Sequence, residues 1–221
     1  MNDVFNRIAS WFYPVRIDKV RGELGHSLEV NLYQGKLVLD TENVNYSYGS
    51  LQDVFDHAFT RTGLYDTHMT NALILGFGSG SVAGLLLEKC DPEIIITGVE
   101  ADTEVIRLAM QYFPVARKSN VTIIHDDVTL FVRTHKNTYD LIVVDVFVED
   151  RVPENCQERD FLQRVKKLLN ANGKVYFNKM VETSRRNSPD PLEKQLRSVF
   201  GSVTDVHVHR EGSGNHVYMC K

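Results

Sequence analysis

Long apolar runs and blocks of like charge are both missing from this sequence of 221 residues. No stretch of about 18 apolar residues occurs, which argues against a transmembrane helix, and MNDVFNRIASWFYP lacks the basic and apolar segments of a secretory signal. The 25 basic and 29 acidic residues are mixed along the chain, so we expect neither nucleic acid nor a membrane as partner. These features predict a cytoplasmic globular protein.

Cysteine is also scarce, and its spacing excludes two kinds of stabilised fold. Cys90, Cys156 and Cys220 form no CxxC pair, which argues against a disulfide scaffold and a zinc site. His207 and His209 share one face of an expected strand, with His216 on the next, but no acidic or thiol ligand joins them at a metal-binding spacing. We therefore expect no bound metal.

Hydrophobic residues make up 43% of the chain, and their pattern changes along it. Residues 13–48 hold short strand segments separated by glycines, which predicts a small antiparallel meander, and residues 50–63 show helical spacing. From residue 71, strands that are apolar on both faces alternate with helices, which predicts a doubly wound, mostly parallel Rossmann-like α/β sheet that ends in an antiparallel hairpin. The helices expected between these strands are 81–89, 103–112, 128–135 and 157–169. The predicted domains are a small β-domain at 1–49 and a nucleoside-binding domain at 50–221.

The turn after the first expected parallel strand is rich in glycine. In LILGFGSGS, Gly76, Gly78 and Gly80 let the backbone approach a ligand, and the following helix offers unpaired N–H groups. Glu100 ends the next strand, about 20 residues further on, where an acceptor for ribose hydroxyls is expected. Ser81 stands where a dinucleotide fingerprint has its third glycine or alanine, so the pattern favours a nucleoside over NAD.

Acidic residues end the next two expected strands as well. Asp126 and Asp127 follow VTIIH, where one carboxylate can accept from an adenine amino group and the other can cap the next helix. For Asp127, capping and adenine binding stay equally open. Asp145 ends YDLIVVD, at the edge where open α/β sheets bind ligands, and this position predicts a functional carboxylate.

Together these segments resemble the class I S-adenosylmethionine-dependent methyltransferase fold, and within it the spermidine synthase (polyamine aminopropyltransferase) branch. The matching segments are LVLD with the following Tyr48, the GFGSG turn, VEAD, the acid before TLFV, YDLIVVD and NHVYMC. The resemblance covers nearly the whole chain. It implies that the glycine turn and Glu100 hold the nucleoside, that Asp126 or Asp127 meets adenine, and that Asp145 helps to deprotonate an amine nucleophile.

Three segments depart from the polyamine synthase pattern. Ser79 stands where the family carries an acid that holds the ammonium group of the aminopropyl donor. Val146 to Glu149 replace a DSSDP-like gate, and Tyr48 to Ser50 replace the acids around a YxE segment. Each missing carboxylate removes a charge-assisted hydrogen bond of roughly 1.5–3 kcal/mol. We place Tyr48, Phe147 and Glu149 on the substrate side of the pocket.

These departures favour methyl transfer from S-adenosylmethionine to an unidentified small acceptor, an amine among the candidates, with Asp145 as the base. The alternative is aminopropyl transfer from decarboxylated S-adenosylmethionine to a polyamine. A catalytically idle nucleoside-binding module is a further alternative, and NAD(P) oxidoreduction is disfavoured because a hairpin replaces further βαβ units. The macromolecular partner that we expect is a second copy of this chain, in a homodimer. The residues assigned to the donor are Gly76, Gly78, Ser79, Gly80, Glu100, Asp126 and Asp127.

Overall fold

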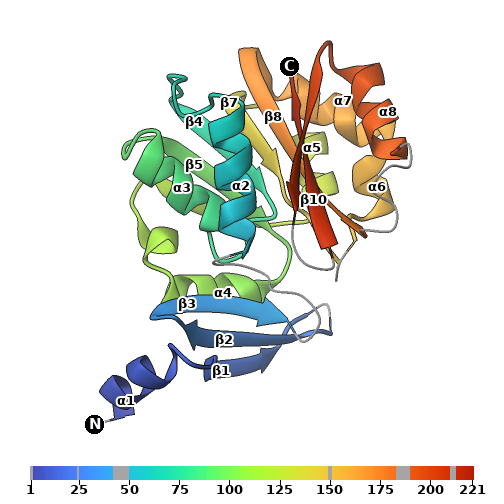
Figure 1. The fold of residues 1–221 in the computed structure, drawn as a ribbon. Helices are drawn as coiled ribbons and strands as arrows, with labels where there is room; N and C mark the ends of the chain where they lie inside the picture. Colours follow the sequence, from blue (N-terminus) through green and yellow to red (C-terminus); the bar gives the residue numbers. More distant parts are fainter. Residues whose placement is uncertain (1, 24, 42–49, 149–150, 183–189, 210–212) are drawn as a thin grey trace.

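The computed structural model describes residues 2–23, 25–41, 50–148, 151–182, 190–209 and 213–221, which form two sheets and their covering helices (Figure 1). The strands are β1 (Val15–Arg21), β2 (Ser27–Tyr33), β3 (Lys36–Thr41), β4 (Asn71–Leu75), β5 (Ile95–Glu100), β6 (Val121–His125), β7 (Tyr139–Val144), β8 (Leu169–Glu182), β9 (Val203–His209) and β10 (Ser213–Cys220). The helices are α1 (Asn2–Ala9), α2 (Ser50–Arg61), α3 (Ser81–Lys89), α4 (Thr103–Tyr112), α5 (Val128–Thr134), α6 (Glu154–Gln157), α7 (Arg159–Lys167) and α8 (Pro191–Val199), with a 3-10 turn at Pro114–Arg117. Among the described residues, no helix is long and apolar enough to cross a membrane.

The larger sheet has seven strands in the order β6-β5-β4-β7-β8-β10-β9. Neighbouring strands from β6 to β8 are parallel, whereas β10 runs antiparallel to both β8 and β9. The predicted doubly wound sheet with a closing hairpin is therefore confirmed. After β4 the chain builds outward to β6 and then returns to place β7 on the other side of β4, so the strand order switches between β4 and β7. Ligands of open α/β sheets bind at such a switch point.

Two hydrophobic cores hold the helices against the two faces of this sheet. Phe59 of α2 meets the ring of Tyr176 in β8 edge to face, with ring centroids 4.9 Å apart. On the opposite face, Phe161 of α7 and Leu196 of α8 pack in one cluster with Phe177 of β8. Burial on both faces explains why these strands are continuously apolar in sequence.

The smaller sheet has the antiparallel order β1-β2-β3, as the meander pattern predicts, and it packs on α4 (Figure 1). Its buried side chains join those of α4 and the following turn in one cluster, whose members are Leu28, Val30, Leu39, Val105, Leu108 and Phe113. The hydroxyl of Tyr112 donates to Asp18 of β1 over 2.9 Å. Residues 42–49 lie outside the described residues, so the expected boundary at 49 stays a prediction.

The local differences from the sequence analysis are few. The helix expected at 157–169 is α7, which spans Arg159–Lys167, and the short helix α6 before it was not expected. The sequence analysis does not anticipate α1, which carries the exposed side chains of Phe5 and Ile8. Asp127 accepts backbone N–H groups at the start of α5, as its capping pattern predicts, and Asp190 accepts one at the start of α8. The three cysteines are free thiols.

Candidate active site

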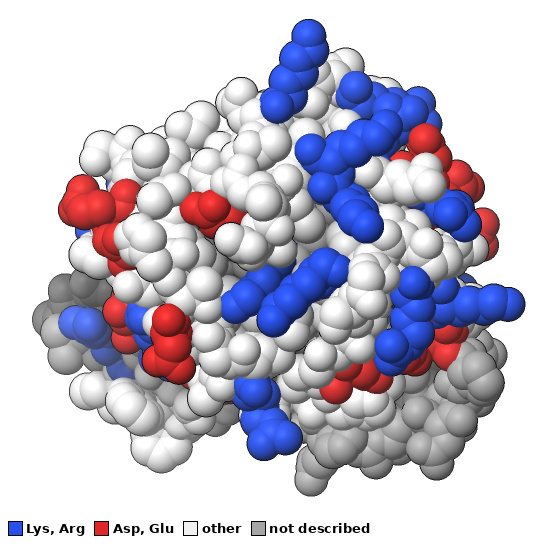
Figure 2. Space-filling view, turned by 90° about the horizontal axis from the view of Figure 1, so that it is seen from above, with Lys and Arg blue, Asp and Glu red and all other residues white. Residues whose placement is uncertain are grey.

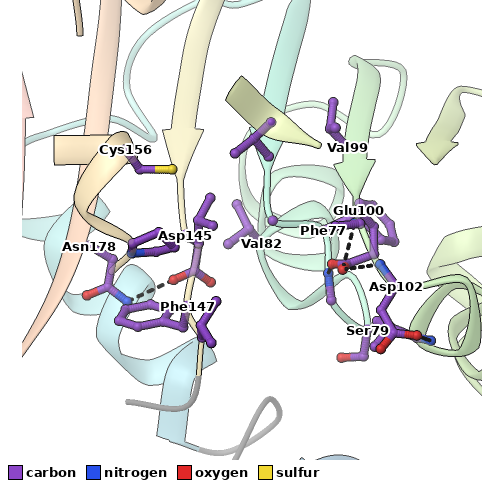
Figure 3. A pocket seen from close by; sticks show the side chains of 18 of the residues that line it. Phe77, Ser79, Val82, Val99, Glu100, Asp102, Asp145, Phe147, Cys156 and Asn178 are labelled. Atoms are coloured by element: carbon purple, nitrogen blue, oxygen red, sulfur yellow. Dashed lines mark hydrogen bonds between the residues drawn. The ribbon is translucent and has the colours of Figure 1, made fainter. Parts of the chain in front are cut away.

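A cavity of about 300 Å³ lies at the switch point, over the carboxyl ends of β4, β5 and β7. Its volume is within the range of small-molecule sites. Figure 3 shows Asp145 and Asn178 on one side of the cavity and Glu100, Asp102 and Ser79 on the other. The small sheet contributes to the wall as well, through His26 and Leu28. Both sheets therefore shape the site.

The glycine turn after β4 forms the floor of the cavity, and two of its glycines are required for different reasons. Gly76 has a φ of 87°, and a Cβ placed on it would lie 2.2 Å from the carbonyl oxygen of Asp145. Gly78 has a φ of 57°, but no atom lies within 4 Å of its Cβ position. The bare backbone at Gly76 lets β4 and β7 approach each other, whereas the open space at Gly78 suits the close approach of a ligand.

This contrast predicts that two alanine substitutions lower stability by different amounts. Gly76→Ala should lower the free energy of unfolding by about 2–4 kcal/mol, because the methyl group clashes with backbone and the left-handed φ is strained. Gly78→Ala should cost about 1–2 kcal/mol, from backbone strain alone. Urea denaturation of both variants measures the difference. Equal losses of stability would contradict the role assigned to Gly76.

Glu100 closes the opposite wall through three backbone hydrogen bonds. Its Oε2 accepts from the N–H of Gly78 over 3.0 Å, and its Oε1 accepts from the N–H groups of Ala101 over 2.9 Å and of Asp102 over 3.1 Å. Burial raises the pKa of Glu100 above its usual range, although these three bonds act in the other direction. A carboxylate has about four acceptor positions, so one position is left for a ligand hydroxyl.

Asp145 follows β7 and is held in place by an asparagine pair. The amide of Asn178 donates to Oδ1 of Asp145 over 2.9 Å, and the amide of Asn215 donates to the carbonyl oxygen of Asn178 over 2.9 Å. Withdrawal from water raises the pKa of Asp145 to about 7, with a further contribution from the charge of Glu100, whereas the bond from Asn178 lowers it. A carboxylate with such a pKa is suited to accept a proton near neutral pH.

Asn178 and Asn215 are functional candidates that the sequence analysis missed. They are 0% and 7% exposed, and both lie inside strands of the large sheet. An amide inside such a strand requires a partner, since a buried unpaired polar group is costly. That signal is present in FNKM and GNHV, but the identity of the partner depends on the pairing of β8 with β10.

The charge of the cavity has one sign. Four of the described lining residues are acidic, namely Glu100, Asp102, Asp127 and Asp145, and none is Lys or Arg. The end of the molecule that carries the C-terminus is opposite to Asp145, because β10 runs antiparallel to β7. Figure 2 shows this end, and Lys and Arg side chains spread over its middle. The charge of the described lining residues favours a cationic ligand.

Cys156 also lines the cavity, but it is poorly suited to nucleophilic chemistry. Burial raises the pKa of its thiol to about 12, and the charge of Asp127 adds to the effect. The reactive thiolate is therefore scarce at neutral pH.

The predicted site residues are brought together to different degrees. Those that line the cavity are Gly76, Gly78, Ser79, Glu100, Asp127, Asp145 and Phe147. Gly80 precedes α3, and neither Gly80 nor Asp126 is among the described lining residues, so their roles stay predictions. Asp127 caps α5 with Oδ1 and lines the cavity, so its two interpretations are compatible. Tyr48 and Glu149 lie outside the described residues.

Comparison with known proteins places this geometry in a family. Residues 59–209 match the spermine/spermidine synthase domain. The chain is 30% identical over 159 residues to a polyamine aminopropyltransferase of Vibrio vulnificus, a match that covers 71% of this chain and 52% of that protein. It is also 33% identical over 136 residues to an N-terminal histidine N-methyltransferase of Emericella nidulans, covering 59% of this chain and 23% of that protein. The chain thus spans about half the length, or less, of these two relatives.

Solved structures share the fold at lower identity. A probable spermidine synthase from Corynebacterium glutamicum superposes with a TM-score of 0.78 and 20% identity, over 92% of this chain and 79% of that one. This likeness extends through the small sheet as well as the large one, since it covers nearly the whole chain. At this identity the likeness shows the fold alone. The match over residues 59–209, which is more than half of the chain, shows that the chain belongs to the spermine/spermidine synthase family.

Proposed function

We propose that the protein transfers an aminopropyl group from decarboxylated S-adenosylmethionine to an amine acceptor. The observation that carries this proposal is the acidic cavity, in which no Lys or Arg is found among the described lining residues. The decarboxylated donor carries two positive groups, a sulfonium and an ammonium. S-adenosylmethionine adds a carboxylate, for which these residues offer no charged partner.

The absence of an acid at Ser79 was a reason to expect methyl transfer from the sequence. This proposal replaces that expectation. The family match and the relatives named as polyamine aminopropyltransferases support the alternative better. Ser79 is 1% exposed and its hydroxyl lies 3.5 Å from that of Ser81, so the turn does lack an acid at this position. The carboxylates of Glu100, Asp102 and Asp127 elsewhere in the wall still favour a cationic donor.

The residues of the cavity support defined roles in donor binding. The remaining acceptor position of Glu100 would take a ribose hydroxyl, and the backbone at Gly78 would allow the donor to approach. Val82, Val99 and Val128 add apolar surface to the same wall, which suits an adenine ring. Asp127 would accept from the adenine amino group with the oxygen that does not cap α5.

In the proposed reaction, the amine nitrogen attacks the carbon next to the sulfonium. The new C–N bond forms as the C–S bond breaks, and the electron pair of that bond neutralises the sulfur and gives methylthioadenosine. Asp145 accepts the proton that the amine loses, because its pKa of about 7 leaves it deprotonated above that pH. The acidic wall would hold both cations in place, and such positioning is a large part of catalysis for a donor that carries its own activation.

Calorimetric titration with four ligands tests the proposal. We expect decarboxylated S-adenosylmethionine and methylthioadenosine to bind, S-adenosylmethionine to bind at least about 10-fold more weakly than the decarboxylated donor, and NAD not to bind. With aliphatic diamines present, turnover should release methylthioadenosine from the decarboxylated donor. Tighter binding of S-adenosylmethionine and release of S-adenosylhomocysteine would restore methyl transfer. Binding without turnover for any amine would favour an idle nucleoside-binding module.

A further inference from the structure

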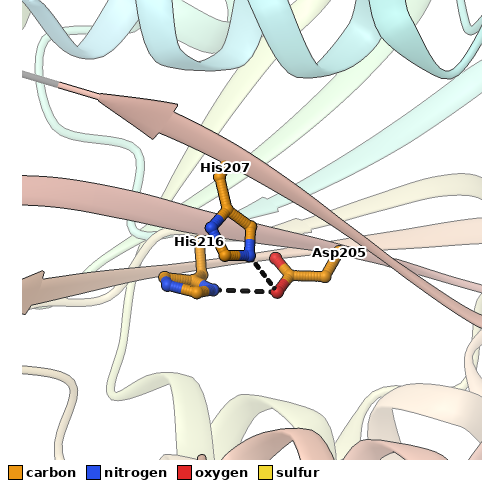
Figure 4. Close-up of side chains that lie close together, drawn as sticks. All are labelled: Asp205, His207 and His216. Atoms are coloured by element: carbon orange, nitrogen blue, oxygen red, sulfur yellow. Dashed lines mark hydrogen bonds and ion pairs between the residues drawn. The ribbon is translucent and has the colours of Figure 1, made fainter. Parts of the chain in front are cut away.

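Three side chains with metal-binding atoms meet on the hairpin that closes the large sheet, away from the cavity. Asp205 and His207 lie on β9, and His216 lies on β10 directly opposite His207 in the strand register (Figure 4). One atom from each side chain lies within 4.8 Å of the corresponding atoms of the other two. None of the three is among the described residues that line the cavity.

The cluster is held by hydrogen bonds to one carboxylate oxygen. Nε2 of His207 lies 2.7 Å and Nδ1 of His216 lies 2.9 Å from Oδ2 of Asp205, and since a carboxylate only accepts, both imidazoles donate. The two imidazole rings have centroids 3.9 Å apart. Figure 4 shows both rings directed toward the same carboxylate. Two imidazole nitrogens and a carboxylate oxygen therefore converge on one point.

The second carboxylate oxygen supplies an independent observation. Oδ1 of Asp205 is buried and has no hydrogen-bond partner among the described residues. A buried acceptor without a partner is costly, and a bound ion is one of the partners that satisfy such atoms in native proteins. The cluster thus combines three side chains that can bind a metal with a carboxylate oxygen, Oδ1 of Asp205, that has no hydrogen-bond partner among the described residues.

We propose that Asp205, His207 and His216 bind a divalent transition-metal ion, with Zn²⁺ as the first candidate. Imidazole nitrogen and carboxylate oxygen are ligands that Zn²⁺ accepts, and three protein ligands leave a coordination position open. The ion takes the place of the two imidazole protons that Asp205 now accepts, and in each neutral imidazole the proton moves to the other ring nitrogen, which faces away from the ion.

The geometry requires only a small rearrangement. Ligand bonds of about 2.0–2.2 Å in a tetrahedral site place ligand atoms about 3.3 Å apart, so each contact to Oδ2 must lengthen by roughly half an ångström. The exposed side chain of His207 can move in this way, whereas His216 is buried and fixes the position of the site. The bound ion would join β9, the edge strand of the sheet, to β10.

Among the residues that the structure describes, no other group of three His, Cys, Asp or Glu side chains brings its ligand atoms together in this way. Burial raises the pKa of the Cys90 thiol to about 11 and that of the Cys220 thiol to about 12. A thiol must lose its proton to bind a metal, so these cysteines are poor ligands at neutral pH. One equivalent of ion per chain is therefore expected.

The test is a titration of the full chain with ZnCl₂ after treatment with a chelator, followed by calorimetry and by thermal unfolding. Co²⁺ in place of Zn²⁺ reports the ligand geometry through its visible absorption bands. We expect one equivalent to bind and to raise the melting temperature. His207→Ala and Asp205→Asn should each weaken binding by at least about 10-fold. His68→Ala, which removes an exposed imidazole outside the cluster, is the matched control and should bind as the wild type does.

The two cluster variants guard against a failure to fold. His207 is exposed and Asp205→Asn keeps the shape of the side chain, so far-ultraviolet circular dichroism should be unchanged for at least one of them. If the wild type binds no Zn²⁺, or if folded His207→Ala and Asp205→Asn bind it like the wild type, the proposed site does not exist.

Discussion

Asp145→Asn should lower turnover by about 10²–10⁴-fold, the range expected when a general base is removed. Asparagine keeps the size of the side chain, and its carbonyl oxygen can still accept from Asn178, but it cannot take the proton of the amine. Binding of the donor should change little, because the substitution acts on the acceptor side of the reaction. Steady-state kinetics with the decarboxylated donor and an active diamine measure turnover, and calorimetry measures donor binding.

The pH profile separates a catalytic role of Asp145 from a structural one. The value of kcat/KM should rise with pH up to about 7 in the wild type, because the carboxylate must be deprotonated to act, and this rise should be absent in Asp145→Asn. Asn178→Ala removes the hydrogen bond that lowers the pKa of Asp145, so the rise should move to higher pH. Wild-type turnover in Asp145→Asn would reduce this residue to a structural strand-end position.

Glu100→Gln should weaken binding of the donor by about 10–100-fold. The substitution removes the charge that accepts from a ribose hydroxyl, and hydrogen bonds to charged groups contribute about 1.5–3 kcal/mol. Glutamine can also place an N–H group against the N–H of Gly78 or of Ala101, which disturbs the floor of the cavity. Calorimetric titration with methylthioadenosine measures the effect without the need for turnover.

Glu104→Gln is the matched control for this prediction. Glu104 lies on α4 near Glu100 in sequence, but it pairs with Arg107 on the surface, and an exposed pair of this kind contributes little. The control should bind methylthioadenosine as the wild type does. Equal affinity of Glu100→Gln and the wild type, with both proteins folded, would mean that the nucleoside lies elsewhere.

The parts of the fold that could be predicted from the sequence depend on local patterns. The parallel strands are apolar on both faces, and Asp127 carries the signature of a helix cap, so these elements are found where expected. The positions of Gly76, Glu100 and Asp145 at strand ends follow from the same patterns, because the ends of parallel strands meet at one edge of a sheet.

The remainder depends on contacts between distant segments. Asn178 reaches Asp145 only because β8 lies beside β7, and Asp205 meets His216 only because β9 and β10 form a hairpin. No metal site was expected from the sequence, because no acid was recognised at a metal-binding spacing from the histidines. Asp205 is nevertheless two residues before His207 and lies on the same strand face. The expectation of methyl transfer, which depended on Ser79, has a similar cause. A sequence motif shows that one acid is missing, but it does not show the charge of the whole cavity.

The shared core between the small sheet and α4 affects whether the protein can be truncated and which mutations it tolerates. Leu28 and Leu39 pack in one buried cluster with Val30 and with side chains of α4 and its following turn, such as Leu108. Removal of residues 1–41 would open that face of α4 to water, next to the wall that holds Asp102. The small sheet and the large sheet should therefore unfold as one cooperative unit. A mutation on one side of this contact should be tolerated only when the other side can compensate for it.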